Sequence, residues 1–228
     1  MFTIIVPVYN KEKVLENAVG VLIDYLKKTF RNSWQMVIAD YGSRDKTTTV
    51  ARRLARENKK IKVVCEASMA KSFGKCVKLL KGDAVVIKPE LVNNAEQIKT
   101  IVELFSDKTN GPDIVNGSRF VKGARYPSFA RKLMCGFYNI FVRLRFKAKK
   151  LDYQCGLKGF REKVFRHLCI ATKTEGMLWF TEALIRAAEM EYDIVQIPVD
   201  YDYKWRMSIK ALIKDFKEIS EIKRSVKL

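Results

Sequence analysis

Apolar, β-branched runs alternate with helical patterns through the first half of this 228-residue chain. The runs typical of buried strands are Phe2–Val8, Trp34–Asp40, Ile61–Glu66 and Asp83–Lys88. Helical spacing of apolar residues follows at 14–26, behind Asn10 as the expected cap, and at 47–58 and 72–81. Strands that alternate with helices predict a doubly wound α/β domain, with a mostly parallel central sheet flanked by helices.

Ligands of such sheets bind at the carboxyl ends of the strands. The residues expected at that edge are Tyr9 and Asn10, then Asp40 to Ser43, then Lys88 to Glu90. No Gly-x-Gly-x-x-Gly follows a strand and no P-loop pattern occurs, which disfavours dinucleotide and P-loop nucleotide folds. The second half of the chain is more irregular, with a strand expected at Tyr192–Val199.

The net charge of +19 implies an anionic partner. Nucleic acid, an acidic membrane surface and phosphorylated substrates all fit this charge. No recognised nucleic-acid-binding motif accompanies it, so we do not expect nucleic acid as the partner. The single histidine, His167, excludes a His-based triad and a histidine zinc site. Five scattered cysteines without a Cys-x-x-Cys pair favour a reducing compartment.

Two basic amphipathic segments occur in the second half of the chain. The apolar stripe of the first is Phe129, Leu133, Phe137, Ile140, Phe141 and Leu144. Its cations are Arg131, Lys132, Arg143, Arg145, Lys147, Lys149 and Lys150. Such a helix either faces the core or lies on acidic lipid, and residues 209–226 leave the same two interpretations open. No apolar run of about 18 residues occurs and Met1–Pro7 resembles a strand, so we expect a cytoplasmic protein, peripheral on the cytosolic membrane face.

Several short motifs resemble those of the family 2 inverting glycosyltransferases, which have the A-type fold. They are Ile5–Glu12, Ala39–Asp45, the Gly-Ser-Arg turn at Asn116–Phe120, Asp152–Arg161, Trp179–Glu182, Gln196–Val199 and Arg206–Lys210. Each motif is weak by itself. Their order along nearly the whole chain is similar to that of the dolichol-phosphate mannose or glucose synthase branch, which implies a single domain over residues 1–228.

The resemblance implies a role for each part of the chain. Residues 1 to about 110 would form the nucleotide-binding half, and about 111–228 the half that faces the acceptor and the membrane. The residues implied in donor binding are Pro7, Tyr9, Asn10, Asp40 and Tyr41. Arg119 and Arg131 would bind the phosphate of a polyprenyl acceptor. Arg206 and Lys210 would clamp phosphates, a task that suits arginine because its guanidinium binds phosphate oxygens in bidentate fashion.

The chain departs from the family pattern at the metal-binding pair of aspartates, where Lys88 and Glu90 stand instead. The second of two adjacent aspartates after the second strand is likewise replaced, by Tyr41. An ammonium group at position 88 would supply part of the positive charge that a leaving diphosphate needs. It would also repel Mg²⁺ or Mn²⁺ from Glu90, the one carboxylate left to hold a metal. Alternatively, Lys88 pairs with Glu90 and fills the metal site of an inactive scaffold.

The resemblance implies a glycosyltransferase that moves a hexose from a nucleoside-diphosphate sugar to a polyprenyl (dolichyl) phosphate. Lys88, Glu90, Arg206 and Lys210 are its expected catalytic residues. An acceptor phosphate is already anionic at neutral pH, so the transfer needs little help from a general base. The alternative is an inactive family member that binds lipid phosphate or a partner enzyme. A separate membrane-anchoring subunit is a further expected partner.

Overall fold

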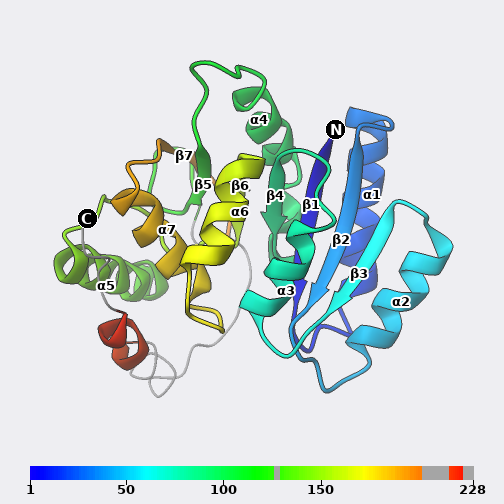
Figure 1. Ribbon diagram of the computed structural model, residues 1–228, viewed down its shortest axis with the longest axis horizontal. Coiled ribbons are helices and arrows are strands. Elements are labelled where there is room, and N and C mark those ends of the chain that lie inside the picture. The colour runs from blue at the N-terminus through cyan, green and yellow to red at the C-terminus, as the bar shows by residue number, and fades with distance from the viewer. Residues whose placement is uncertain (126–128, 202–215, 223–228) are drawn as a thin grey trace.

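The computed structural model describes residues 1–125, 129–201 and 216–222, and the side chains of 129–131 lie outside this description (Figure 1). Seven strands form one sheet in the order β3-β2-β1-β4-β6-β5-β7. Their bounds are β1 Phe2–Val8, β2 Trp34–Asp40, β3 Ile61–Cys65, β4 Ala84–Ile87, β5 Ile114–Ser118, β6 Leu157–Phe160 and β7 Ile194–Pro198. The expected strands are therefore present: β1 and β2 have the predicted bounds, and β3, β4 and β7 differ from theirs by one or two residues at an end.

The sheet is mostly parallel, as predicted. Strand β1 pairs in parallel with β2 and β4, with Val8 opposite Asp40 at its end. Strand β6 runs antiparallel between β4 and β5, and β5 pairs in parallel with β7. Strands β2 and β3 therefore lie on one side of β1, and β4 and the later strands lie on the other. The carboxyl ends of β2, β1 and β4 are neighbours at one edge of the sheet.

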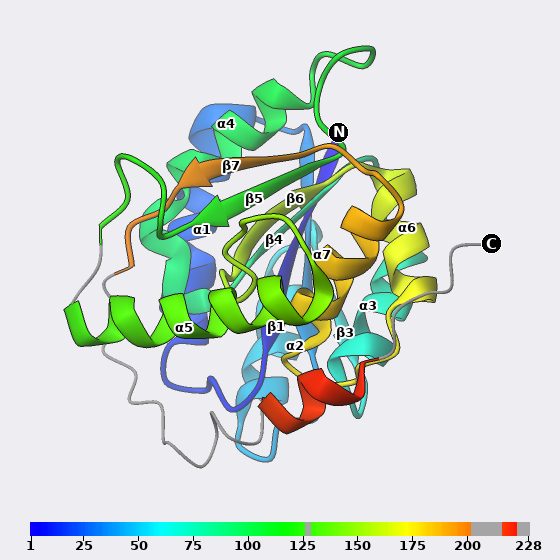
Figure 2. The same ribbon diagram turned by 90° about the vertical axis from the view of Figure 1, so that its left-hand side faces the viewer.

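Helices cover both faces of the sheet (Figures 1 and 2). Their bounds are α1 Leu15–Phe30, α2 Thr47–Glu57, α3 Met69–Val77, the 3₁₀ turn η1 Pro89–Asn94, α4 Glu96–Leu104, α5 Phe129–Phe146, α6 Glu162–Ala171 and α7 Trp179–Glu189. Successive residues of a strand point to opposite faces. Ile5 accordingly joins a core built with α3, α6 and α7, while Ile4 and Val6 join a second core built with α1, α2 and α4.

Asn10 does not cap the first helix, so that prediction was wrong. Helix α1 begins at Leu15, four residues later than the cap would require. Asn10 instead has a φ of 51°, in the left-handed region that asparagine tolerates, and its side-chain oxygen accepts the Arg44 N–H at 2.8 Å. The asparagine therefore joins two loops. The helix predicted at 72–81 instead begins earlier than expected, at Met69 behind a Ser68 cap, and ends at Val77.

Helix α5 has two apolar faces, and Figure 2 shows it lying across one side of the molecule. Its inner face packs Tyr138 and Val142 into the core, each with 0% exposure. Its outer face leaves four large apolar side chains exposed: Leu133, Phe137, Ile140 and Leu144, at 51, 60, 53 and 74%. Four of the six residues of the predicted stripe are therefore exposed, whereas Phe141 packs against the core and the side chain of Phe129 lies outside the described residues.

The described part of the C-terminal basic segment packs inward. Ile219 and Ile222 are buried, and Phe216 contacts Phe141 of α5 with ring centroids 4.7 Å apart. Core packing therefore accounts for this stretch, and the segment's other apolar residues lie outside the described part of the chain. Across the described residues, no helix has both the length and the apolar character that crossing a membrane requires.

Candidate functional site

The loops that follow β1 and β2 are tied together by hydrogen bonds. The Asn10 N–H donates to the Ser43 hydroxyl at 3.0 Å, and the Glu12 carboxylate accepts the Lys46 N–H at 2.9 Å. Because both loops leave neighbouring parallel strands, these bonds fix the shape of the sheet edge where a ligand would bind. Asn10 lies at the predicted edge, where its hydrogen bonds to Ser43 and Arg44 hold the two loops together. Pro7 is buried within β1.

Asp40 lies at the end of β2 with 1% of its surface exposed. One carboxylate oxygen accepts the Ser43 N–H at 2.9 Å, and the other accepts the Thr48 hydroxyl. The Asp40 carbonyl accepts the Ser72 hydroxyl at 2.8 Å. These bonds fix the conformation of the turn after β2, so Asp40 supports the site from inside the protein. Direct donor binding by Asp40 stays a prediction.

Tyr9 and Tyr41 stack on each other at the same edge. Their ring centroids are 5.6 Å apart and the rings lie 18° from parallel. Tyr9 is 41% exposed, whereas burial and the nearby charges of Glu90 and Asp40 raise the pKa of Tyr41 well above its usual value. Tyr41 therefore keeps its proton, and its hydroxyl donates to the Met177 sulfur at 3.3 Å. The pair offers a flat aromatic surface of the kind on which a ring system stacks.

Glu90 pairs with Lys11 and not with Lys88. The Lys11 ammonium reaches from the β1–α1 loop and contacts the Glu90 carboxylate, which stands in the first turn of η1. The predicted alternative, an ion pair of Lys88 with Glu90, is therefore wrong, since Lys11 occupies that carboxylate. Side-chain exposures of 23% for Lys11 and 14% for Glu90 place this pair at the border of the protein interior.

Lys88 directly follows β4, and its aliphatic part lies across Gly156. A methyl group added to Gly156 would stand 2.6 Å from Lys88 Cδ. The ammonium lies 3.8 Å from the Met177 sulfur and 5.4 Å from the centre of the Phe180 ring. Desolvation lowers the pKa of Lys88 to about 8, and the Lys11 and Arg119 charges act in the same direction while Glu90 opposes them. Of the residues that the structure describes, none forms an ion pair with Lys88.

The residues at this edge do not fit a divalent metal ion. Mg²⁺ and Mn²⁺ prefer several oxygen ligands, above all carboxylates. Within residues 1–125, 129–201 and 216–222, no group of three or more His, Cys, Asp or Glu side chains stands close enough together to hold one. At the position of the family's metal-binding aspartates, Glu90 is the one carboxylate, and it already forms an ion pair with Lys11. Lys88 adds a second positive charge beside it.

Arg119 forms a buried ion pair with Asp152. The guanidinium binds both carboxylate oxygens at 2.7 Å, and the Arg119 N–H donates to the same group at 3.0 Å. The neighbouring Lys158 is fully buried, where desolvation lowers its pKa to about 8, and it donates to Asn116 and to the Cys155 carbonyl, both at 2.7 Å. This network joins two of the family motifs in the core. Binding of an acceptor phosphate by Arg119 stays a prediction.

The other predicted phosphate-binding groups cannot be placed. Arg206 and Lys210 lie outside the described residues, and so does the side chain of Arg131 on helix α5.

Four residues at the site had no predicted role: Lys11, Gly156, Met177 and Phe180. Lys11, Gly156 and Phe180 stand within the family motifs, so the sequence marked their positions as important but did not indicate what they contact. Nothing in the sequence marks Met177, which reaches Tyr41 and Lys88 from the loop before α7.

The sheet order and the loops at its carboxyl edge define an A-type glycosyltransferase fold, and solved structures share it. Glucosyl-3-phosphoglycerate synthase from Mycobacterium tuberculosis, in complex with UDP, superimposes with a TM-score of 0.67 at 15% identity. That match covers 98% of this chain and 81% of the synthase. The mannosyltransferase PcManGT from Pyrobaculum calidifontis, in complex with GDP-Man and Mn²⁺, gives a TM-score of 0.64 at 18% identity and covers 98% and 65%.

The sequence model of glycosyl transferase family 2 matches residues 3–169, and the chain belongs to this family. Glycosyltransferase AglD of Haloferax volcanii is 26% identical over 209 residues, which are 89% of this chain and 33% of AglD. The dolichyl-phosphate beta-glucosyltransferase of Saccharomyces cerevisiae is 23% identical over 221 residues, which are 87% of this chain and 66% of that enzyme. The chain thus spans a third of the first relative and about two thirds of the second.

Proposed function

We propose that this domain transfers a hexose from a nucleoside-diphosphate sugar to a polyprenyl phosphate, of which dolichyl phosphate is one. The observation that carries the proposal is the arrangement at the sheet edge. A stacked aromatic pair, Tyr9 and Tyr41, lies beside the cations Lys88 and Lys11. An aromatic surface suits a nucleobase and ammonium groups suit a diphosphate. Membership of glycosyl transferase family 2 and the names of its dolichyl-phosphate relatives support this assignment.

The chemistry requires few groups from the protein. An oxygen of the acceptor phosphate attacks the anomeric carbon of the hexose, the bond from that carbon to the diphosphate breaks, and the nucleoside diphosphate leaves. Inversion at the anomeric carbon follows from this single displacement. No proton moves, because the acceptor is already an anion. Positive charge beside the diphosphate stabilises the leaving group, and we assign that role to Lys88, with Arg206 and Lys210 as further contributors.

The alternative is an inactive member that binds lipid phosphate or a partner. The replacement of the metal-binding aspartates motivates it, but the two relatives named above are transferases. Lys88 is half-buried where β4 ends, and it forms no ion pair with any of the described residues. Both points support transfer over the binding module.

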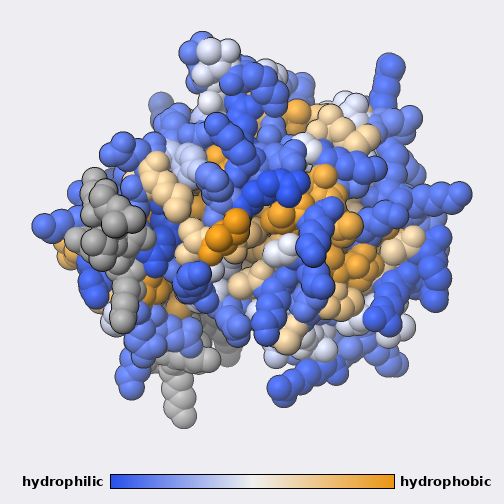
Figure 3. Space-filling model, in the orientation of Figure 1, coloured by the Kyte–Doolittle hydropathy of each residue, from blue (hydrophilic) through white to orange (hydrophobic). Residues whose placement is uncertain are grey.

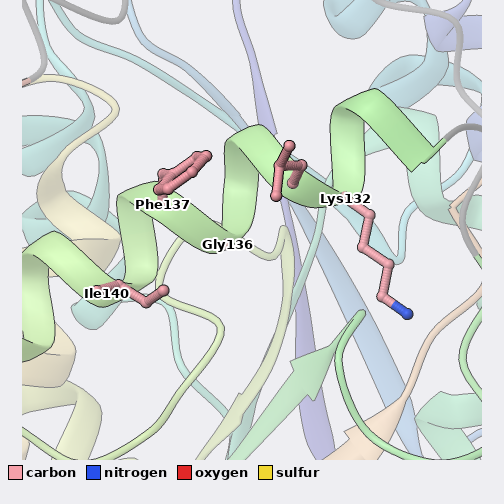
Figure 4. Close-up of a pocket in the computed structure, with 5 residues that line it drawn as sticks. Lys132, Gly136, Phe137 and Ile140 are labelled. Atoms are coloured by element: carbon pink, nitrogen blue, oxygen red, sulfur yellow. The ribbon is translucent and has the colours of Figure 1, made fainter.

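The outer face of α5 supports a place on an acidic membrane surface. A pocket on this face is lined by Lys132, Leu133, Gly136, Phe137 and Ile140, and Figure 4 shows the side chains of Lys132, Phe137 and Ile140 projecting from the helix. Exposed apolar side chains with adjacent cations are typical of helices that lie in a lipid interface. We assign the protein to the cytosolic leaflet of that membrane, with a membrane-anchoring subunit as a further partner. Helix α5 belongs to the half of the chain that faces the acceptor, at 111–228. The donor-binding half would then be 1–110, from which Tyr9, Tyr41 and Lys88 come.

An assay of transfer tests the proposal. The purified chain is mixed with vesicles that contain dolichyl phosphate, and with labelled UDP-glucose or GDP-mannose, in parallel reactions with EDTA, Mg²⁺ and Mn²⁺. We expect label in the lipid fraction with one of the donors, and an inverted anomeric configuration by NMR. Unphosphorylated dolichol is the matched control acceptor and should remain unlabelled. The absence of labelled lipid under all these conditions would leave the binding module as the better assignment.

A further inference from the structure

We propose that Lys88 and Lys11 together bind the donor diphosphate without a divalent cation, and that Glu90 is a counterion of Lys11 and not a metal ligand. This inference rests on the proposed function, because it takes the donor to be a nucleoside-diphosphate sugar. In this chain, two ammonium groups would thus take the place of the metal ion that the family pattern implies.

The surroundings of Lys88 point to an anionic ligand. Its ammonium contacts the Met177 thioether and the face of Phe180, neither of which carries a charge to match it. Sulfur and aromatic rings are polarisable and tolerate a cation, but a partly buried ammonium gains most from an oxygen anion. The lowered pKa of Lys88 has the same cause, since desolvation is its largest contribution. A phosphate oxygen at this position would supply the anionic partner that Lys88 does not find among the described residues.

The stem of Lys88 is held at the edge by the backbone of the neighbouring strand segment. The Lys88 N–H donates to the Gly156 carbonyl at 3.0 Å, and the aliphatic chain passes over the Gly156 α-carbon, where any side chain would collide with it. The lysine is therefore directed along one path, toward Met177 and Phe180. Such preorganisation is expected for a binding group and is unnecessary for a solvated surface lysine.

The charges around Glu90 oppose metal binding. One carboxylate faces two lysines, of which Lys11 contacts it directly and Lys88 interacts with it through space. A divalent cation would have to displace Lys11 and then remain close to Lys88, and like charges at such distances repel strongly in a partly buried site. A diphosphate meets the opposite situation. It can attract Lys11 away from Glu90 and bind both ammonium groups at once.

Binding calorimetry on the full chain tests this inference. UDP and GDP are titrated in EDTA, in Mg²⁺ and in Mn²⁺, with uridine and guanosine as controls that lack the diphosphate. We expect one diphosphate to bind in EDTA, with a gain of less than about twofold on adding metal. Lys88→Met keeps an unbranched side chain, one heavy atom shorter than lysine, and removes its charge, and we expect it to weaken diphosphate binding by at least about tenfold.

Glu90→Gln separates the two roles of this carboxylate. As the counterion of Lys11, its loss leaves diphosphate affinity in EDTA unchanged or increases it. As a metal ligand, its loss would abolish metal-dependent binding. Lys99→Met, at an exposed position of α4, is the matched control for removal of one positive charge and should change affinity by less than about twofold. Circular dichroism verifies that each variant is folded.

The outcomes also separate this inference from the proposed function. Binding that requires Mg²⁺ or Mn²⁺ and is lost in Glu90→Gln would overturn the metal-free site and leave the transferase assignment in place. Binding in EDTA that Lys88→Met does not weaken would overturn the role of Lys88. If neither diphosphate binds under any condition, both proposals fail.

Discussion

Arg119 and Asp152 form a bidentate ion pair in the protein interior, with exposures of 5% and 0%. The pair joins the Gly-Ser-Arg turn that follows β5 to the segment that precedes β6, 33 residues further along the chain. Burial alone would raise the pKa of Asp152, but the adjacent Arg119 charge and its hydrogen bonds hold that pKa below the usual value. Two motifs that the sequence presents separately are thus one structural unit.

Removing the charge of Asp152 should destabilise the protein strongly. Asp152→Asn leaves the Arg119 guanidinium buried without a counterion, which costs about 3–5 kcal/mol in comparable pairs. Urea denaturation followed by circular dichroism measures the free energy of unfolding. The control is Asp200→Asn, which removes an exposed ion pair with Arg125 and should cost less than about 1 kcal/mol. Equal effects of the two substitutions would contradict the structural role of the buried pair.

The sequence predicted the strands well for a physical reason. A strand buried on both faces must be apolar at nearly every position, and β1 and β2 are buried throughout. Such runs end where the burial ends, so the predicted bounds of both strands match the structure. The edge where Tyr9, Tyr41 and Lys88 meet followed from the same argument, because the carboxyl ends of adjacent parallel strands must be neighbours.

The partners of the charged side chains could not be predicted in this way. Whether Glu90 pairs with Lys88 or Lys11 depends on the path of the β1–α1 loop. Hydrogen bonds to Ser43, in the loop after β2, and to Thr47, the first residue of α2, determine that path. The failure of Asn10 as a helix cap has the same origin, since its side chain binds across those loops. Contacts between distant loops leave no periodic trace in a sequence.

Gly156→Ala should weaken diphosphate binding through Lys88. The new methyl group would stand 2.6 Å from Lys88 Cδ and must displace that flexible side chain. We expect a loss of affinity of at least about tenfold by calorimetry, comparable to that of Lys88→Met. Gly74→Ala is the matched control, because nothing lies within 4 Å of the added methyl group, and it should bind normally. Since both substitutions act on one group, Lys88→Met with Gly156→Ala should bind no worse than Lys88→Met. A clear further loss in the double variant would contradict this coupling.

The outer face of α5 should bind acidic lipid. Phe137→Ser with Leu144→Ser removes two side chains that are 60 and 74% exposed in the structure, so the fold loses little. Burying each in lipid is worth about 1.5–3 kcal/mol, and the double variant should therefore sediment with phosphatidylserine vesicles at least about tenfold less well. Ile170→Ser, at an equally exposed position on α6, is the matched control and should sediment normally. Equal losses for the control and the double variant would argue against α5 as the membrane-binding face.

Diphosphate binding in EDTA should weaken at alkaline pH, because it depends on the Lys88 ammonium. The pKa of Lys88 is about 8, lowered from 10.5 chiefly by desolvation, so the group carries its charge at pH 7 and loses it above pH 8. We expect affinity to be steady from pH 6.5 to 7.5 and to approach a tenfold loss per unit above about pH 8. Calorimetry at a series of pH values measures this dependence, and Lys88→Met should show none in the same range.

The same lowered pKa predicts that Lys88 reduces the stability of the unliganded protein. A lysine whose pKa is lower in the folded state than in the unfolded state binds its proton more weakly when folded. The resulting cost is fully present below pH 8 and disappears as pH rises toward 10.5. Lys88→Met should therefore have a higher Tm than the wild type at pH 7, with a smaller difference at pH 10, although it binds diphosphate less well. A charge that weakens the fold and strengthens binding is the signature of a functional group. A lower Tm for Lys88→Met at pH 7 would instead make Lys88 a structural residue.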